Sequence, residues 1–238
     1  MRLRTPDAPQ ERGNHGGRPY WLWQPETPPP WPAMVIVHGA GSGKESHADF
    51  ARLCAGSGWV ALTYDQRGHG GSEDLMAPAA LGDVGRMTAF LAAREGIDPA
   101  RICARGSSLG GYLAIHAAAT EDGIAGAIAI CPASDEGLRR GLRDGSLEMR
   151  ADVDALDAWL GEHDLREAAA ALAPKPLMLL HAKGDERVPY TWSEELAERA
   201  GSDSTRLLIL PGGHHRSVQH DPELQSTALR WIDRKLSV

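Results

Sequence analysis

The sequence is poor in aromatic residues and in cysteines. Aromatic residues make up 5% of the 238 residues, and the three cysteines are scattered along the chain. Three scattered cysteines do not form the framework of a disulfide-stabilised protein, and Cys103 and Cys131 lie in apolar runs where a free thiol acts as a small buried hydrophobe. A reducing compartment is therefore expected.

Long apolar runs and basic clusters are also missing. No stretch approaches the roughly eighteen apolar residues that a membrane-spanning helix needs, so no membrane association is expected. Residues 1–17 contain no apolar core of a secretory signal, which favours the cytoplasm. The formal net charge is −7, and a nucleic-acid partner is not expected because phosphate binding needs a basic surface.

Short apolar runs alternate with longer segments of helical periodicity. This alternation is typical of a parallel sheet covered by helices, and runs that are apolar throughout indicate strands buried on both faces. The sequence therefore predicts an α/β fold with a doubly wound, mainly parallel sheet. The predicted strands are residues 20–23, 33–37, 59–64, 101–104, 126–131, 176–181 and 205–210, and the predicted helices are residues 46–57, 81–95, 109–120, 190–200 and 222–236.

Two segments interrupt this alternation. Residues 1–18 are polar and rich in glycine, and we interpret them as a loose N-terminal arm. Residues 135–163 form a charged connection between two predicted strands, and a connection of this length usually has a function. We expect a single domain over residues 19–238, with residues 135–163 as a small helical cap.

The strongest chemical signal is a G-x-S-x-G pattern at residues 106–110, between a predicted strand and a predicted helix. In that context the pattern indicates a nucleophile elbow, with Ser108 exposed on a sharp turn. The flanking glycines remove the β-carbons that would collide where strand and helix pass closely. Ser107 is the competing serine, but it lacks a glycine two residues beyond it. Ser108 is therefore the predicted nucleophile.

The loop at residues 38–41, His-Gly-Ala-Gly, follows the predicted strand at 33–37. Its small residues allow close approach of a substrate, so the backbone N–H groups of Ala40 and Leu109 are predicted to bind an oxyanion. The same region resembles a phosphate-binding loop, but His38 stands where the first glycine is needed. Glu45 stands where a hydroxyl would bind magnesium. Nucleotide binding is therefore not expected.

A serine nucleophile needs a base, and the base needs an orienting acid. Asp185 follows the predicted strand at 176–181, and we prefer it to its neighbour Glu186 and to a purely turn-forming role. The base is expected in the glycine-rich loop at residues 211–215, where composition alone does not choose between His214 and His215.

The chain resembles the α/β-hydrolase superfamily over about residues 19–236, in its branch of serine esterases, thioesterases and acyl-peptidase-like enzymes. The order Ser108, Asp185, histidine is that of the family's triad. The family's G-x-x-H spacing, counted from Gly212, selects His215. The motifs that carry the resemblance are HGAG (38–41), DQRGHGGS (65–72), GSSLGG (106–111), GDERVP (184–189) and PGGHH (211–215).

The resemblance implies a serine hydrolase that cleaves an ester or thioester of a small acyl substrate, with no metal or organic cofactor. Two alternatives remain: a hydrolase of small peptides or acyl-peptides, similar to prolyl oligopeptidase, and a non-catalytic binding protein on the same scaffold. The family's sheet usually has more strands at its N-terminal side than residues 1–24 indicate, so the first strand is expected to be missing or irregular. The oligomeric state is left open.

Overall fold

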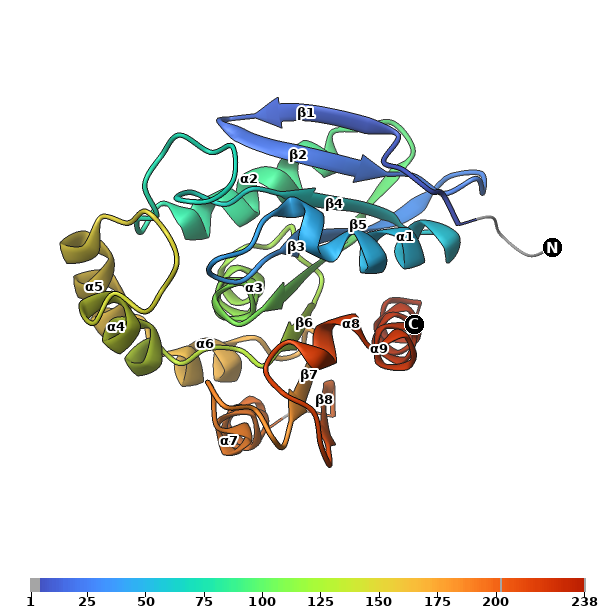
Figure 1. Ribbon diagram of the computed structural model, residues 1–238. Helices are drawn as coiled ribbons and strands as arrows, with labels where there is room; N and C mark the ends of the chain where they lie inside the picture. The colour runs from blue at the N-terminus through green and yellow to red at the C-terminus, as the bar shows by residue number, and fades with distance from the viewer. Residues whose placement is uncertain (1–4, 202, 238) are drawn as a thin grey trace.

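An open sheet forms the centre of the structure (Figure 1). The computed structural model describes residues 5–201 and 203–237, and within them the strands are hydrogen-bonded in the order β1-β2-β4-β3-β5-β6-β7-β8. β2 pairs in the antiparallel sense with both β1 and β4, and all the other neighbours pair in parallel. The predicted doubly wound, mainly parallel sheet is confirmed.

The central strands are buried on both faces. Every residue of β4 and β7 is buried, because helices cover both sides of a sheet whose parallel strands need crossover connections. The strands are β2 (Arg18–Trp23), β3 (Trp31–Val37), β4 (Val60–Tyr64), β5 (Ile97–Ser107), β6 (Ala127–Ile130), β7 (Leu177–Ala182) and β8 (Thr205–Leu210).

The sheet divides the apolar core into two clusters, one on each face, and helices cover both. One cluster includes residues of α2 (Ala80–Ala92), α3 (Leu109–Thr120), α6 (Leu165–Ala171) and α7 (Tyr190–Ala200). The other includes residues of α1 (Ala48–Gly56) and α9 (Pro222–Leu236). Two further helical elements have only four residues each, η1 (Lys44–His47) and α8 (Ser217–His220).

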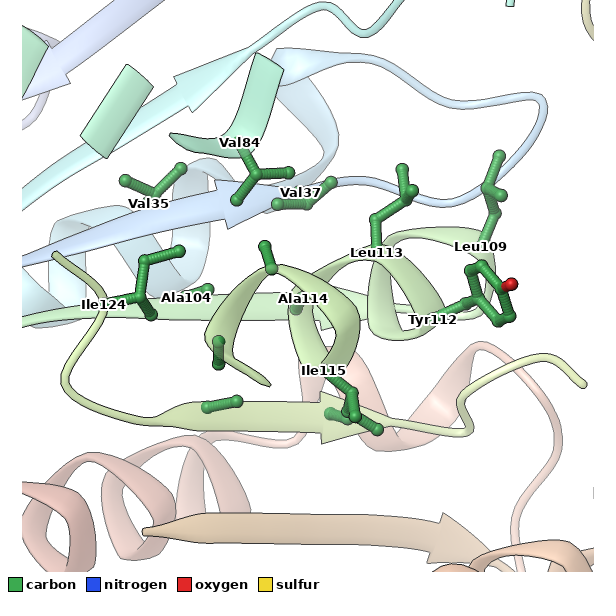
Figure 2. Packing of buried hydrophobic residues seen from close by; sticks show 14 of the residues in the cluster. Val35, Val37, Val84, Ala104, Leu109, Tyr112, Leu113, Ala114, Ile115 and Ile124 are labelled. Atoms are coloured by element: carbon green, nitrogen blue, oxygen red, sulfur yellow. The ribbon is translucent and has the colours of Figure 1, made fainter. Parts of the chain in front are cut away.

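Helix α3 is buried almost all round, from Leu109 to Ala118. Figure 2 shows it over β5, where Leu113 and Ala114 lie near Val37 of β3. Its small residues allow this close packing. The helix that begins at the predicted nucleophile is therefore fixed by the core. Within the part of the chain that the structure describes, no helix has the length and apolar character needed to cross a membrane.

The interpretation of residues 1–18 as a loose arm is wrong for residues 11–18. Residues Glu11–His15 form β1, an edge strand that pairs with β2. Its side chains are polar and none is buried, so the segment lacks the apolar alternation that identifies a strand in a sequence. Backbone pairing with β2 holds it in place, and the N-terminal side of the sheet is complete where a missing or irregular strand was expected. Residues 1–4 lie outside the described residues.

The segment 135–163 contains two helices, α4 (Asp135–Arg143) and α5 (Val153–Glu162). Figure 1 shows them together at the edge of the molecule that is remote from the C-terminus. Arg139 and Arg143 of α4 form ion pairs with Asp157 of α5, at 3.2 and 2.7 Å. The charged residues of this segment therefore join the two helices, and their apolar faces pack on the core.

Candidate active site

Ser108 occupies a strained turn between β5 and α3. Its φ of 54° and ψ of −118° place it in a region that non-glycine residues seldom adopt. Backbone hydrogen bonds hold this conformation: Ser108 donates its N–H to the Ile130 carbonyl at 2.9 Å, and its own carbonyl accepts from Tyr112 and Ala133 at 3.0 and 3.1 Å. Such strain is common where a side chain must be presented to a substrate.

Two glycines allow the strand and helix to meet at this turn. A β-carbon on Gly106 would lie 1.9 Å from the Gly110 carbonyl oxygen, and one on Gly110 would lie 2.1 Å from the Val37 oxygen. No side chain can be accommodated at such distances. The glycines of the G-x-S-x-G pattern are thus required by the packing of β5, α3 and β3.

Ser107, the competing serine, is turned toward another group. Its hydroxyl donates to the Gln219 side-chain oxygen at 2.7 Å, and Gln219 also accepts, through its carbonyl, from the buried Arg105 at 3.0 Å. Arg105 in turn contacts His47 Nδ1 at 2.9 Å. The Ser107 hydroxyl therefore belongs to a buried network that joins β5 to α8.

The loop after β3 passes directly against Ser108. A β-carbon on Gly39 would lie 3.3 Å from the Ser108 Cβ, and Ala40 and Ser108 line the same cavity. Leu109 is the first residue of α3, so its N–H has no acceptor within the helix. The two predicted oxyanion donors thus lie on the segments that flank Ser108.

His38 holds this loop through hydrogen bonds between its two ring nitrogens and backbone groups. Its Nε2 accepts from the Gln66 N–H at 3.1 Å, so its Nδ1 carries the proton and donates to the Gly39 carbonyl at 2.8 Å. Burial lowers the pKa of His38 to about 4, against a smaller opposing effect of the Gly39 hydrogen bond. The ring is therefore neutral at physiological pH.

Lys44, the lysine of the excluded phosphate-binding pattern, is paired with two carboxylates. Its ammonium lies 2.8 Å from Asp65 and 2.8 Å from Glu45. Asp65 also accepts the backbone N–H groups of Lys44 and Gly71. This lysine therefore joins the loop after β3 to the turn at residues 65–72.

Asp185 and His215 are hydrogen-bonded to each other. The Nδ1 of His215 lies 2.8 Å from the Oδ2 of Asp185. The other carboxylate oxygen of Asp185 accepts the backbone N–H groups of Arg187 and Val188, at 2.8 and 2.9 Å. Burial raises the pKa of Asp185, but hydrogen bonds from His181, His215 and the backbone outweigh it and hold the pKa well below its ordinary value. Asp185 is therefore ionised at neutral pH.

His214 and Glu186 take different positions from their neighbours. His214 is exposed, and its Nδ1 accepts the Arg216 N–H at 3.3 Å. Glu186 accepts the backbone N–H of His215 at 3.1 Å. Of the four candidates in these two loops, the structure brings Asp185 and His215 together, and Glu186 supports the loop that carries His215.

A second histidine, His181, contacts Asp185 and was not among the predicted site residues. His181 Nε2 lies 3.0 Å from the Val188 carbonyl and 3.2 Å from Asp185 Oδ2, so this nitrogen carries a proton. Its Nδ1 lies 2.7 Å from the Ser193 hydroxyl. His181 ends the apolar run of β7, and a polar residue at that place was the available signal.

Cys131 is the third group near this pair. Its Sγ and one ligand atom each of Asp185 and His215 lie within 4.8 Å of one another, the one such group found among the described residues. Burial raises the pKa of the Cys131 thiol, so the thiolate that a metal would need is disfavoured. Asp185 and His215 are already bonded to each other. This set therefore fits an acid and base better than a metal site.

A cavity of about 360 Å³ opens above these residues. Its wall comes from the nucleophile elbow, the loop after β3, the loop of His215 and the helix α4. Its lining includes Ala40, Ser108, Leu138, Leu147 and His215. Segment 135–163 thus forms one side of a cavity that is also lined by Ser108 and His215.

Comparison with known proteins decides the family. The model of the prolyl oligopeptidase family matches residues 52–238, a range that includes the elbow and the loops of Asp185 and His215. The chain belongs to the prolyl oligopeptidase family. It therefore belongs to the α/β-hydrolase superfamily, and the resemblance drawn from its motifs is confirmed.

Two relatives of similar sequence are longer than this chain. An uncharacterized protein of Mycobacterium tuberculosis is 27% identical over 201 residues, which cover 81% of this chain and 64% of that protein. The 2,6-dihydropseudooxynicotine hydrolase of Paenarthrobacter nicotinovorans is 29% identical over 207 residues, covering 83% of this chain and 56% of the enzyme. The chain thus spans about three fifths of these relatives.

Solved structures share the fold over nearly the whole chain. The α/β hydrolase GrgF from Penicillium sp. sh18 superposes with a TM-score of 0.77 at 18% identity, covering 93% of this chain and 95% of GrgF. Est1E from Butyrivibrio proteoclasticus superposes with a TM-score of 0.74 at 18% identity, covering 97% of this chain and 98% of Est1E. These likenesses establish the α/β-hydrolase fold of this chain.

Proposed function

We propose that this protein is a serine hydrolase that cleaves an ester or thioester bond of a small acyl substrate. Ser108 is the nucleophile, His215 the general base and Asp185 the acid that orients it. The observation that carries the proposal is the 2.8 Å hydrogen bond between Asp185 and His215, beside a cavity that His215 shares with Ser108.

The hydrogen bond to Asp185 fixes the tautomer of His215. Asp185 is ionised and accepts a hydrogen bond from Nδ1 of His215. The proton of neutral His215 therefore stays on Nδ1, and its Nε2 is free to accept a proton. His215 takes the Ser108 proton as the hydroxyl attacks the carbonyl carbon, and then gives a proton to the leaving group. Water, activated in the same way, releases the acyl group from Ser108.

The backbone N–H groups of Ala40 and Leu109 bind the oxyanion of the tetrahedral intermediate in this proposal. Two preorganised donors in a site that excludes water stabilise such an intermediate by several kcal/mol. His38 supports one donor by holding the loop after β3. The other donor is fixed by the burial of α3. These steps use only side chains and backbone of this chain together with water.

Segment 135–163 is proposed to act as a cap that limits substrate size. Leu138 and Leu147 line the cavity on this side. A cavity of about 360 Å³ is at the small end of ligand sites in proteins. Short acyl groups are therefore the expected substrates.

Hydrolysis of small peptides or acyl-peptides is the second candidate, and the match to the prolyl oligopeptidase family favours it. Among the described residues no propeller accompanies the α/β fold to select peptides. Relatives whose names specify a substrate act on small molecules, as the 2,6-dihydropseudooxynicotine hydrolase does. Ester or thioester cleavage is therefore the favoured reaction.

A panel of substrates tests the proposal. We expect hydrolysis of 4-nitrophenyl esters or acyl-CoA thioesters, with the highest kcat/KM at short acyl chains, and slower cleavage of aminoacyl anilides. Ser108→Ala should lower kcat by about 10³-fold or more, because only oxyanion binding then remains. Faster cleavage of the anilides would favour the peptidase, and turnover unaffected by Ser108→Ala would contradict the mechanism.

A further inference from the structure

The cavity beside Ser108 has an unusual set of charges. Its charged lining residues are three arginines, Arg140, Arg187 and Arg216, and one aspartate, Asp144. The whole chain has a formal net charge of −7, so this local excess of positive charge is contrary to the overall balance. The three arginines come from separate places: α4, the loop after β7 and the loop after β8.

These arginines have no ion-pair partner within 4.0 Å among the described residues, and their side chains are exposed. The neighbours of Arg140 on α4 behave differently, since Arg139 and Arg143 both pair with Asp157. Arg140 lies between them in sequence and lines the cavity. The same helix thus uses two arginines to bind α5 and leaves a third for the cavity.

The acidic groups nearby neutralise the cluster only in part, because three arginines and one ionised aspartate line the cavity. Asp144 accepts the Ser146 N–H at 2.9 Å, and this hydrogen bonding lowers its pKa more than the charge of Arg140 does. Glu186 accepts the N–H of His215. Like charges gathered around a concave site repel one another and raise the local concentration of anions. An anionic ligand would relieve that repulsion.

We infer that the substrate of Ser108 carries an anionic group, a carboxylate being the simplest, which binds Arg140, Arg187 and Arg216 while its carbonyl lies at Ser108. The inference rests on the proposed function and specifies its substrate class. A guanidinium offers a planar pair of donors that matches a carboxylate, and such charge-assisted bonds are stronger than neutral ones. Apolar lining by Leu138 and Leu147 suits the methylene chain between the two ends.

Matched substrates test this inference. One pair, mono-4-nitrophenyl adipate and 4-nitrophenyl hexanoate, differs by a carboxylate in the acyl half. The other pair, 3-acetoxybenzoate and 3-acetoxybenzamide, differs by a carboxylate in the leaving group. We expect the anionic member of one pair to have a kcat/KM at least about tenfold higher, which corresponds to one good charged contact. Added salt should reduce this preference.

The double variant Arg140→Gln/Arg187→Gln should lower the anionic-to-neutral ratio of kcat/KM by about tenfold or more. Arg206→Gln is the matched control, because Arg206 is an exposed arginine of β8 that does not line the cavity. The anionic-to-neutral ratio of kcat/KM for Arg206→Gln should equal that of the unsubstituted protein. Equal rates for both members of both pairs would overturn the inference, even if the neutral esters are hydrolysed as the proposed function requires.

Binding gives the same comparison without turnover. Calorimetry should show adipate binding to the Ser108→Ala protein, with 1,6-hexanediol binding at least about tenfold more weakly. Adding Arg140→Gln and Arg187→Gln to that protein should remove the difference in affinity. If no ester is hydrolysed but adipate binds through these arginines, the proposed function fails and the anion site stands. If esters are hydrolysed but adipate and the diol bind equally, the anion site fails alone.

Discussion

At the residue scale, the adjacent histidines His214 and His215 have different surroundings. His215 is buried against Asp185, and His214 is exposed. We predict that His215→Ala lowers kcat on 4-nitrophenyl butyrate about as much as Ser108→Ala, and that the two changes together add little, because the residues act as a unit. His214→Ala is the matched control and should cost at most about tenfold, through misplacement of the loop. The reverse order of effects would make His214 the base.

Asp185 faces only donors, and this makes Asp185→Asn informative. Oδ1 accepts two backbone N–H groups, which cannot change their role, so the amide nitrogen of asparagine must take the place of Oδ2. There it faces His215 Nδ1, and His215 must move its proton to Nε2. We predict a fall in kcat of about 10⁴-fold, with a thermal midpoint changed by only a few degrees. Retention of full activity would show that Asp185 only shapes the turn.

At the scale of elements, α3 connects Ser108 to segment 135–163, the proposed cap. Tyr112 of α3 donates its hydroxyl to the His163 carbonyl at 2.6 Å, just beyond α5. His116, one turn further along α3, packs against Tyr112 and Trp159. Burial lowers the pKa of His116 to about 4, aided by the nearby His163. The contact between α3 and the cap therefore requires a neutral histidine.

This burial predicts a pH dependence of stability. Because the folded pKa of about 4 lies below the ordinary 6.5, the unfolded chain binds the proton first as the pH falls. The stabilisation is therefore complete above pH 6.5 and is lost between pH 6.5 and 4. His116→Phe removes the proton-binding group, so we predict that it reduces the loss of unfolding free energy between pH 7 and 5 by about 2 kcal/mol.

Urea unfolding at the two pH values measures this effect. His38 and His47 are also buried with lowered pKa values, so some acid sensitivity should remain in the variant. His214→Phe is the control, because His214 is exposed and its replacement should leave the loss of unfolding free energy between pH 7 and 5 unchanged. An unchanged loss of stability in His116→Phe would show that His116 does not contribute to the acid sensitivity.

At the scale of the whole molecule, apolar runs predicted the seven strands that lie between covering helices. β1 has no apolar face and was missed, because edge strands depend on backbone pairing more than on burial. α6 was missed because its seven residues are too few to show a helical period. In the site, Ser108 was recognisable from flanking glycines, whereas His181 and the arginines are brought together only by the fold.

Covalent labelling with a fluorophosphonate, followed by mass spectrometry of the modified peptide, tests whether Ser108 is the nucleophile. We expect a single phosphonate on Ser108, slow labelling of His215→Ala, and none of Ser108→Ala. Ser107→Ala is the matched control, since its hydroxyl is turned to Gln219, and it should still be labelled. A phosphonate on Ser107, or a protein that remains unlabelled, would show that Ser108 is not the nucleophile.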